Sequence, residues 1–429
     1  MSVVVLFGVF FGLVALQVPI VAAMLAAALV VTWVEGAIPL TIIAQRMAPI
    51  LDSFPFLAIP LFVLAGNLLN RSGLARRIFD FSGALVGHLR GGLAHVNVLA
   101  SMIFAGMSGV AQADAAGLGQ VEVREMKRAG YDPAFASAVS AASAVIGPII
   151  PPSVIMVIYA VLTGVSVADL FIAGIVPGVM LGLALMITIV VMARVGRIDV
   201  PVQPRADRGT LARTFVRALP ALVAPVGLTA GLLTGVATPT ELGALTVAYA
   251  ILLGFLQREL TVRALFVAAY ETVIICGVLV FIVAAAAPLG WLIAIKNIPA
   301  GLAEAMLAVS RDPIVILAII NVGLLIAGCV LETGAILLIV VPALYPLIVQ
   351  LGIDPVHFGL VVVFNLLIGT VTPPFGVLLF IMMEIGQVSY WRLVRAIAPF
   401  YLPLGAMLLL ITYVPTLSLW LPRLVRGLG

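Results

Sequence analysis

The sequence contains few charged residues. Only 9% of its 429 residues are Asp, Glu, Lys or Arg, whereas 64% are hydrophobic. A water-soluble globular domain carries roughly 25% charged residues, so this composition excludes one. The apolar residues form runs of roughly 15 to 30 residues, long enough to enter or cross a ~30 Å hydrocarbon layer. We therefore predict an all-α polytopic membrane protein with about 10–12 membrane segments.

Cysteine and histidine are also scarce, with two and three copies. No Cys/His cluster has the spacing of a zinc site, and no G-x-x-x-x-G-K-[ST] motif is present. These absences argue against a structural zinc and against ATP hydrolysis through a P-loop. The net charge of +4 comes mainly from arginines between the apolar runs. Such loop arginines set the orientation of a chain in the membrane. We therefore expect lipids and not nucleic acid around the chain.

Paired prolines interrupt two of the apolar runs. Residues 146–152 and 368–374 both read Ile-Gly-x-x-x-Pro-Pro. A proline in a helix lacks an N–H and pushes away the carbonyl four residues back. Each unpaired carbonyl in a bilayer costs several kcal/mol unless a polar group lies beside it. Helix breaks at matching places in two halves of a chain therefore point to the binding site of a transporter. The breaks are predicted to free the carbonyls of Gly147, Pro148, Gly369 and Thr370.

Two further apolar stretches turn back at glycine-rich centres. Residues 91–119 are apolar on both sides of Gly106-Met107-Ser108-Gly109. Each arm of roughly 15 residues would measure about 22 Å as a helix, enough to pass the middle of the layer but not to cross it. Residues 313–351 have the same form, with their break between Gly328 and Gly334. Both stretches are predicted to be re-entrant helical hairpins.

The two halves share features at a fixed offset of 222 residues, which indicates an internal repeat. Asp132-Pro133 aligns with Asp354-Pro355, Ser143 with Asn365, and the two Pro-Pro motifs with each other. We predict a first repeat at 1–193 with a broken helix at 131–164, a cytoplasmic linker at 194–217, and a second repeat at 218–429 with a broken helix at 355–384. Residues 2–33, with Pro19 in the middle, make one kinked span or two short ones.

Basic residues predict that the repeat is inverted. The first hairpin is flanked by many of them, whereas the second has little nearby beyond Lys296 and Arg311. Positive flanks stay in the cytoplasm, so the two hairpins should enter from opposite faces and their tips should meet near the midplane. The flanking residues of the first hairpin are Arg71, Arg76, Arg77, Arg90, Arg124, Lys127 and Arg128.

The tips and breaks would offer helix ends, free carbonyls and hydroxyl groups. Helix N-termini suit carboxylates, and carbonyls with hydroxyls suit Na⁺. Asp114 and Glu332 lie near the tips, and an acid inside a membrane is a candidate for a functional role. An equally weighted alternative is that each acid caps a hairpin helix or faces a water-filled cavity. Another alternative is that glycine and serine only allow close helix packing and that the proline kinks are structural. Residues 218–288 and their first-half counterparts are predicted to form a scaffold beside the hairpins and broken helices, and Glu271, in an apolar span, is expected to pair within it or with a partner helix.

One motif also fits an enzyme. Gly106-Met107-Ser108-Gly109 fits the G-x-S-G of rhomboid-like intramembrane proteases, which need a histidine base within hydrogen-bond reach of the serine. His95 would be the candidate base. That interpretation leaves the repeat unexplained, so transport is preferred.

Several stretches in this order resemble the large membrane subunit of tripartite ATP-independent periplasmic (TRAP) transporters over nearly the whole chain. The resemblance implies an elevator-type secondary transporter of the bacterial inner membrane that takes up a small organic acid with Na⁺. It also implies a separate small four-helix membrane subunit and a periplasmic substrate-binding protein, and a one-component anion transporter is the alternative. The stretches are Phe54–Phe62, Gly106–Gly109 through Ala113–Ala116, Gly147–Ser153, Ala237–Glu241 and Gly369–Gly376.

Carried onto matching positions, the resemblance places Na⁺ ligands at both tips and both breaks. Where this family often has another small hydroxyl residue after Ser108-Gly109, the chain has Val110, so any ligand role for a hydroxyl there is lost. The implied Na⁺ ligands are Ser108, Gly109, Gly147, Pro148, Gly328, Thr333, Gly369, Thr370 and Thr372. The candidate substrate contacts are Ser108, Asp114, Pro151, Pro152, Glu332 and Pro373.

Overall fold

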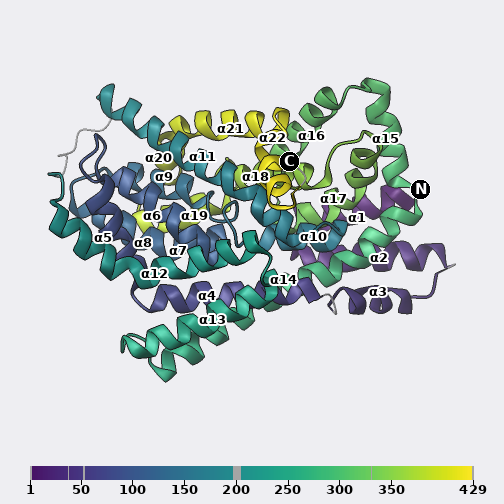
Figure 1. The fold of residues 1–429 in the computed structure, drawn as a ribbon. Coiled ribbons are helices and arrows are strands. Elements are labelled where there is room, and N and C mark those ends of the chain that lie inside the picture. The colour runs from purple at the N-terminus through teal and green to yellow at the C-terminus, as the bar shows by residue number, and fades with distance from the viewer. Residues whose placement is uncertain (1, 37, 52–53, 197–203, 330, 428–429) are drawn as a thin grey trace.

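The computed structural model describes residues 2–36, 38–51, 54–196, 204–329 and 331–427. Regular structure in these ranges is helical (Figure 1), as predicted. By length and composition, seven helices could cross a membrane, or eight if the bent pair of α15 and α16 counts as one span. Shorter apolar helices make up much of the rest, so the all-α membrane fold is confirmed.

The first half of the chain contains helices up to α11. Their bounds are α1 (Ser2–Ala15), α2 (Ile20–Glu35), α3 (Thr41–Leu51), η1 (Phe54–Leu57), α4 (Ala58–Arg71), α5 (Leu74–Val86), α6 (Leu93–Ser108), α7 (Ala111–Ala116), α8 (Leu118–Arg128), α9 (Pro133–Ala144), α10 (Val154–Thr163) and α11 (Val167–Arg194). Residues 2–33 thus belong to two short helices, because Pro19 begins the second one.

The second half contains the remaining helices. Their bounds are α12 (Arg208–Thr234), α13 (Pro239–Leu256), α14 (Val262–Ile295), α15 (Ile298–Val309), α16 (Pro313–Gly328), α17 (Thr333–Gln350), α18 (Pro355–Gly369), α19 (Val377–Gly386), α20 (Tyr390–Ile397), η2 (Ala398–Phe400), α21 (Tyr401–Tyr413) and α22 (Thr416–Val425).

Two predicted boundaries differ from the structure. Residues 208–217 of the expected linker are helical because the Asp207 carboxylate caps α12, accepting from the N–H groups of Gly209 and Thr210; residues 197–203 lie outside the described ranges. The returning arm of the first hairpin, predicted to end at residue 119, continues in α8 to Arg128.

Helices α4, α12, α13 and α14 form one side of the molecule, with α2 and α3 against the far end of α14 (Figure 1). The 34-residue α14 is held to α4 by the Arg71–Glu271 ion pair at 2.5 Å and by the amide of Asn67, which donates to Thr272 Oγ1 at 3.0 Å. The predicted pairing of Glu271 within this scaffold is therefore confirmed.

Both predicted helix breaks are present. α9 ends at Ala144 and α10 begins at Val154, while α18 ends at Gly369 and α19 begins at Val377. The peptide bond between the two prolines is cis in each break. Each break thus separates two short helices within one apolar run.

The two halves exchange contacts reciprocally. α10, which follows the first break, packs on α17, which follows the second hairpin tip; α19, which follows the second break, packs on α7, which follows the first tip. A second reciprocal pair joins α9 to α19 and α18 to α10: Ser137 of α9 lies against Gly386, and its repeat counterpart Gly359 of α18 lies against the ring of Tyr159. The orientation of the two halves in the membrane stays a prediction.

Glycines allow two close approaches that fix the hairpins. A Cβ at Gly369 would lie 2.7 Å from the Cα of Gly328, so the second tip rests on the second break backbone to backbone. A Cβ at Gly106 would lie 2.4 Å from Cβ of Pro225, where α6 crosses α12. Neither approach leaves room for a methyl group.

We predict that Gly369→Ala lowers the thermal stability of the purified protein by about 1–3 kcal/mol, because two backbones must separate. Gly323→Ala is the matched control, since a Cβ there meets nothing within 4 Å and alanine favours the helix. Thermal unfolding in detergent measures both. Equal midpoints for the two variants would show that the glycine contact does not hold the tip.

We also predict that Gly106→Ala destabilises the protein to a similar degree, about 1–3 kcal/mol, by forcing α6 away from α12. Gly227→Ala, on the exposed face of α12, should leave the unfolding midpoint unchanged or raise it, because nothing lies within 4 Å of its added Cβ. An unchanged midpoint for Gly106→Ala would mean that the two helices are not in fixed contact.

Candidate functional site

The tip of the first hairpin rests on the first helix break. Gly109 has a φ of +68°, and its carbonyl accepts a hydrogen bond from the N–H of Val154 at 3.2 Å. A Cβ at Gly109 would lie 2.6 Å from the carbonyl oxygen of Pro152. Positive φ and close backbone approach both require glycine here. The predicted pairing of tip and break is therefore present in the first half.

Asp114 and Ser108 meet beneath this contact. The Ser108 hydroxyl donates to the Asp114 carboxylate, and both side chains are buried. A Cβ at Gly147 would lie 2.0 Å from Asp114 Oδ2, so the carboxylate lies against the backbone of the break. No Lys or Arg pairs with Asp114 in the part of the chain that the structure describes. The site therefore holds a buried acid without a protein cation beside it.

The first break leaves carbonyl groups free, as predicted. Within the described residues, neither Gly147 nor Pro148 receives a hydrogen bond at its carbonyl oxygen. A cavity of about 20 Å³ lies on the other side of Ser108, lined in part by Gly66, Asn67 and Val110. The first tip thus brings a carboxylate and a hydroxyl against the backbone of a break that has two free carbonyls, and these oxygen types suit a hard cation.

The second break differs in this respect. The carbonyl of Gly369 accepts from the N–H of Thr372 at 3.0 Å, and that of Thr370 accepts from the N–H of Leu378 at 3.0 Å. The prediction that these two carbonyls are free is wrong, because the chain after the break turns back and brings its own N–H groups to them. The hydroxyls of Thr370 and Thr372 donate to the carbonyls of Leu367 and Ile368 at 2.6 and 2.7 Å.

The second tip is joined to this break by backbone contacts. The carbonyl of Cys329 accepts from the N–H of Phe375 at 3.2 Å, and Gly328 touches Gly369. Glu332 caps α17, accepting from the N–H of Ala335 at 3.1 Å with Thr333 following it, so the capping alternative for this acid is confirmed.

The candidate residues therefore form two clusters. One contains Ser108, Gly109, Asp114, Gly147, Pro148, Pro151 and Pro152; the other contains Gly328, Glu332, Thr333, Gly369, Thr370, Thr372 and Pro373. Among the described residues, no hydrogen bond connects one cluster to the other.

The geometry does not support a protease centred on Ser108. His95 lies near the other end of α6, and 13 residues of helix correspond to about 20 Å. Its Nε2 contacts the carbonyl of Arg90 at 2.8 Å. His95 therefore cannot take the proton of Ser108.

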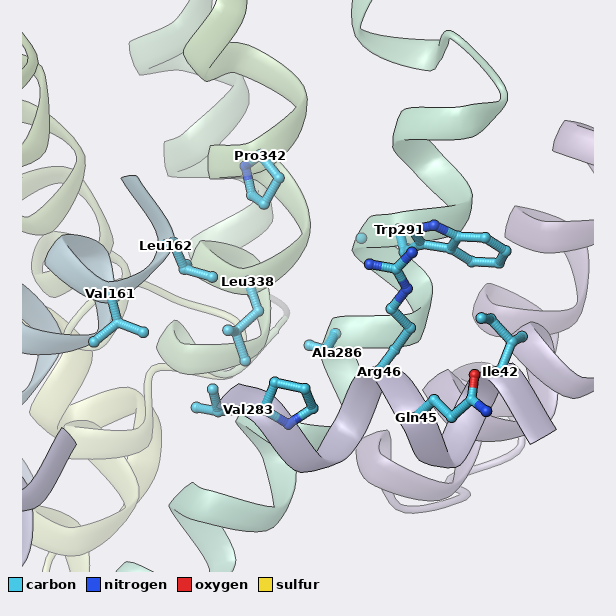
Figure 2. Close-up of a pocket in the computed structure, with 13 residues that line it drawn as sticks. Ile42, Gln45, Arg46, Val161, Leu162, Val283, Ala286, Trp291, Leu338 and Pro342 are labelled. Carbon is cyan, nitrogen blue, oxygen red and sulfur yellow. The ribbon is translucent and has the colours of Figure 1, made fainter. Parts of the chain in front are cut away.

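A larger cavity, of about 760 Å³, lies between the scaffold and the hairpin elements. Figure 2 shows Arg46 of α3 reaching toward it with its guanidinium beside Trp291 of α14, 5.0 Å from the ring centroid. Arg46 is the one charged residue among the described residues that line the cavity. The opposite wall is apolar and comes from α10 and α17, with Val161, Leu162, Leu338 and Pro342.

Arg46 is not among the site residues predicted from the sequence. It is a basic residue among apolar ones, which is itself a signal for a functional role inside a membrane. The sequence offered no reason to separate it from the other arginines, however. Only the packing of α3 on α14 shows that it faces a cavity.

Comparison with known proteins identifies the family. The family model for the tripartite ATP-independent periplasmic transporter, DctM component, matches residues 7–417. The sialic acid TRAP transporter large permease SiaM of Vibrio cholerae is 40% identical over 388 residues, which is 90% of each chain. The 2,3-diketo-L-gulonate TRAP transporter large permease YiaN of Escherichia coli is 36% identical, over 97% of this chain and 98% of that protein.

A further relative is the C4-dicarboxylate large permease DctM of Pseudomonas aeruginosa, 37% identical over 87% of each chain. Among solved structures, the YdaH transporter of Alcanivorax borkumensis has the same overall fold, with a TM-score of 0.59 at 16% identity and coverage of 90% and 88%. The apolar helices and these relatives together place the chain in the bacterial inner membrane as a multi-pass protein. The chain belongs to the DctM family, the large permeases of tripartite ATP-independent periplasmic transporters.

Proposed function

We propose that the chain carries a small organic acid into the cell together with Na⁺. The hairpins and broken helices would move as one unit against the scaffold, as in an elevator. The observation that carries the proposal is the oxygen cluster between the first tip and the first break, with Asp114 and the free carbonyls of Gly147 and Pro148.

The physical case for Na⁺ is one of charge and coordination. A buried carboxylate is costly unless a positive charge lies beside it, and the described chain supplies none to Asp114. Hydroxyl and carbonyl oxygens next to that carboxylate complete a set of hard ligands. A bound Na⁺ would neutralise Asp114 and satisfy the free carbonyls, so the unit could pass through the apolar layer at lower cost.

The substrate site is proposed at the cavity of Arg46. The relatives are named for sialic acid, C4-dicarboxylates and 2,3-diketo-L-gulonate, all of which carry a carboxylate. A guanidinium binds a carboxylate through two parallel hydrogen bonds. Because this cavity lies between α3 and α14 on one side and α10 and α17 on the other, a bound acid would contact both the scaffold and the moving unit.

Partners follow from the family and from the exposed apolar surface. In the apolar 18-residue stretch of each helix, only 28% of the residues of α12 and 33% of those of α13 are buried. We propose that a small four-helix subunit docks on this face of the scaffold and that a periplasmic binding protein delivers the acid. A one-component transporter would instead take up substrate when the binding protein is left out of reconstituted vesicles.

We predict that Na⁺ raises the unfolding temperature of the purified protein when it replaces K⁺ at constant ionic strength. Binding at 100 times the dissociation constant adds about 2.7 kcal/mol. Asp114→Asn should abolish this response and Ser108→Ala should weaken it. Thr372→Ala tests the second cluster. Glu304→Gln, an exposed acid on α15, is the control and should respond like the wild type. An undiminished response in Asp114→Asn would exclude the proposed site.

We predict that Arg46→Lys raises the KM for acid uptake by about tenfold or more, because the two parallel hydrogen bonds are lost. Arg46→Ala should raise it further. Uptake of the three acids named for the relatives would be measured in vesicles holding the complete transporter. Arg311→Lys, on the exposed segment before α16, is the control. An unchanged KM in Arg46→Ala would place the substrate elsewhere.

A further inference from the structure

A ring of polar side chains is buried inside the first hairpin unit, which we define as α6 to α9. It contains Asn97 and Ser101 of α6, Glu122 of α8, and Ser140 and Ser143 of α9. Each of these side chains is buried, and only 1% of Glu122 is exposed. None of them belongs to the oxygen cluster at the hairpin tip.

The hydrogen bonds of this ring can be assigned by counting hydrogens. A serine hydroxyl has one hydrogen to donate, and an asparagine oxygen can only accept. The contacts are Ser143 Oγ to Asn97 Oδ1 at 2.8 Å, Ser101 Oγ to Ser143 Oγ at 3.0 Å, Ser101 Oγ to Glu122 Oε1 at 3.1 Å, and Asn97 Nδ2 to Ser140 Oγ at 2.5 Å.

With the Asn97 amide in this orientation, one direction makes all four contacts hydrogen bonds. The hydrogen of Ser143 goes to Asn97 Oδ1, or to the carbonyl of Ser140 at 3.2 Å, so Ser143 does not donate to Ser101. Ser101 must then donate to Ser143 and has no hydrogen left for Glu122. The contact between Ser101 and Glu122 is a hydrogen bond only if the carboxyl of Glu122 donates, and a carboxyl donates only when it is protonated.

The orientation of the Asn97 amide supports this direction. Its N–H groups meet Ser140 Oγ at 2.5 Å and the sulfur of Met126 at 3.7 Å. If the amide were turned over, Ser143 and Ser101 could donate in turn to an ionised Glu122, but the amide oxygen would then face the sulfur, which has no hydrogen to donate. The Ser140 hydroxyl in turn reaches the Glu122 carboxyl, which closes the ring.

The surroundings favour the same state. Among the described residues, no cation lies within ion-pair distance of Glu122. Of the helices packed on α8, α9 carries no titratable residue and α7 carries Asp114, a second acid and not a cation. A buried, unpaired carboxylate would be costly.

The other titratable groups on α8 and on the helices packed against it either contact residues other than Glu122 or lie outside the ring. His95 on α6 contacts the Arg90 carbonyl, and Arg77 on α5 pairs with Glu259. The rest are Arg76 and Asp80 on α5, Glu384 on α19, and Arg124, Glu125, Lys127 and Arg128 on α8 itself.

The second half shows that the hairpin fold does not need this ring. At the repeat offset, Glu122 corresponds to Leu344, Ser101 to Gly323 and Asn97 to Ile319. Leu344 therefore fills the equivalent place in α17, and Asn365, the counterpart of Ser143, bonds to Asn321 there instead. The carboxyl is thus particular to the first half.

We propose that Glu122 and its ring are a proton-binding site, separate from the cation cluster at the tip. The ring oxygens touch one another directly through hydrogen bonds, so no space for a metal ion remains among them. A bound proton makes the hairpin unit neutral at this position. The proposal does not depend on Na⁺ coupling or on the identity of the substrate.

Infrared spectroscopy of the full chain in lipid nanodiscs tests the proposal directly. An Asp114→Asn background removes the other buried acid of the unit. At neutral pH the spectrum should contain the carbonyl stretch of a protonated carboxyl, and Glu122→Gln should remove it. Glu125→Gln, on the exposed side of the same helix, should leave it in place. Absence of the band, or its loss when Na⁺ is added, would overturn the proposal.

Thermal unfolding against pH gives a second readout. The native chain holds a proton on Glu122 that the unfolded chain releases near pH 4.3, so native stability should fall as the pH rises above that value. Relative to Glu122→Gln, the unfolding equilibrium constant of the wild type should increase by about tenfold per pH unit.

Glu122→Gln should fold, because its amide N–H can donate to Ser101 and keep the direction of the ring. Glu122→Leu removes the carboxyl and should lack the pH dependence of the wild type. Ser101→Ala disturbs the packing of the ring but keeps the buried carboxyl and should retain it, which separates loss of packing from loss of the proton. Parallel pH curves for the wild type and Glu122→Gln would overturn the proposal.

Discussion

Every backbone N–H and carbonyl inside an apolar layer must find a partner, and the structure is arranged around two places where a helix cannot supply one. At each Pro-Pro break the hairpin tip of the same half brings its own backbone into contact. Val154 donates to Gly109 in one half and Phe375 donates to Cys329 in the other. The hairpins thus cover the polar ends of the broken helices. This requirement explains why a hairpin and a break occur together in each half.

Close contact between two backbones needs residues without side chains. Gly109, Gly147 and Gly174 surround the first break, and Gly328 meets Gly369 at the second. The scaffold is held differently, by ion pairs such as Arg71–Glu271 and Arg77–Glu259. The hairpin tips are thus tightly packed on their breaks, and α6 also packs closely on α12, whereas a large cavity with Arg46 lies between α3 and α14 on one side and α10 and α17 on the other.

Three buried or partly buried acids in the two hairpins have three different surroundings. Glu332 caps a helix, Asp114 lies against the backbone of the first break without a cation, and Glu122 closes a ring of hydroxyls and an amide. In sequence they give the same signal, an acid in or near an apolar run. Only the surroundings separate the capping role of Glu332 from the cation site proposed at Asp114 and the proton site proposed at Glu122.

The sequence by itself determined the membrane fold, both helix breaks and most helix positions, because apolar runs, Asp-Pro starts and Pro-Pro pairs act locally. The 222-residue offset also identified the residues at tips and breaks. It could not show that Gly369 and Thr370 lose their free carbonyls, because that depends on how the chain turns after the break. Nor could it find Arg46 or the partners of Glu122, which come from helices far apart in sequence. Tertiary structure alone decided these points, since burial, hydrogen direction and cavity walls depend on which helices become neighbours.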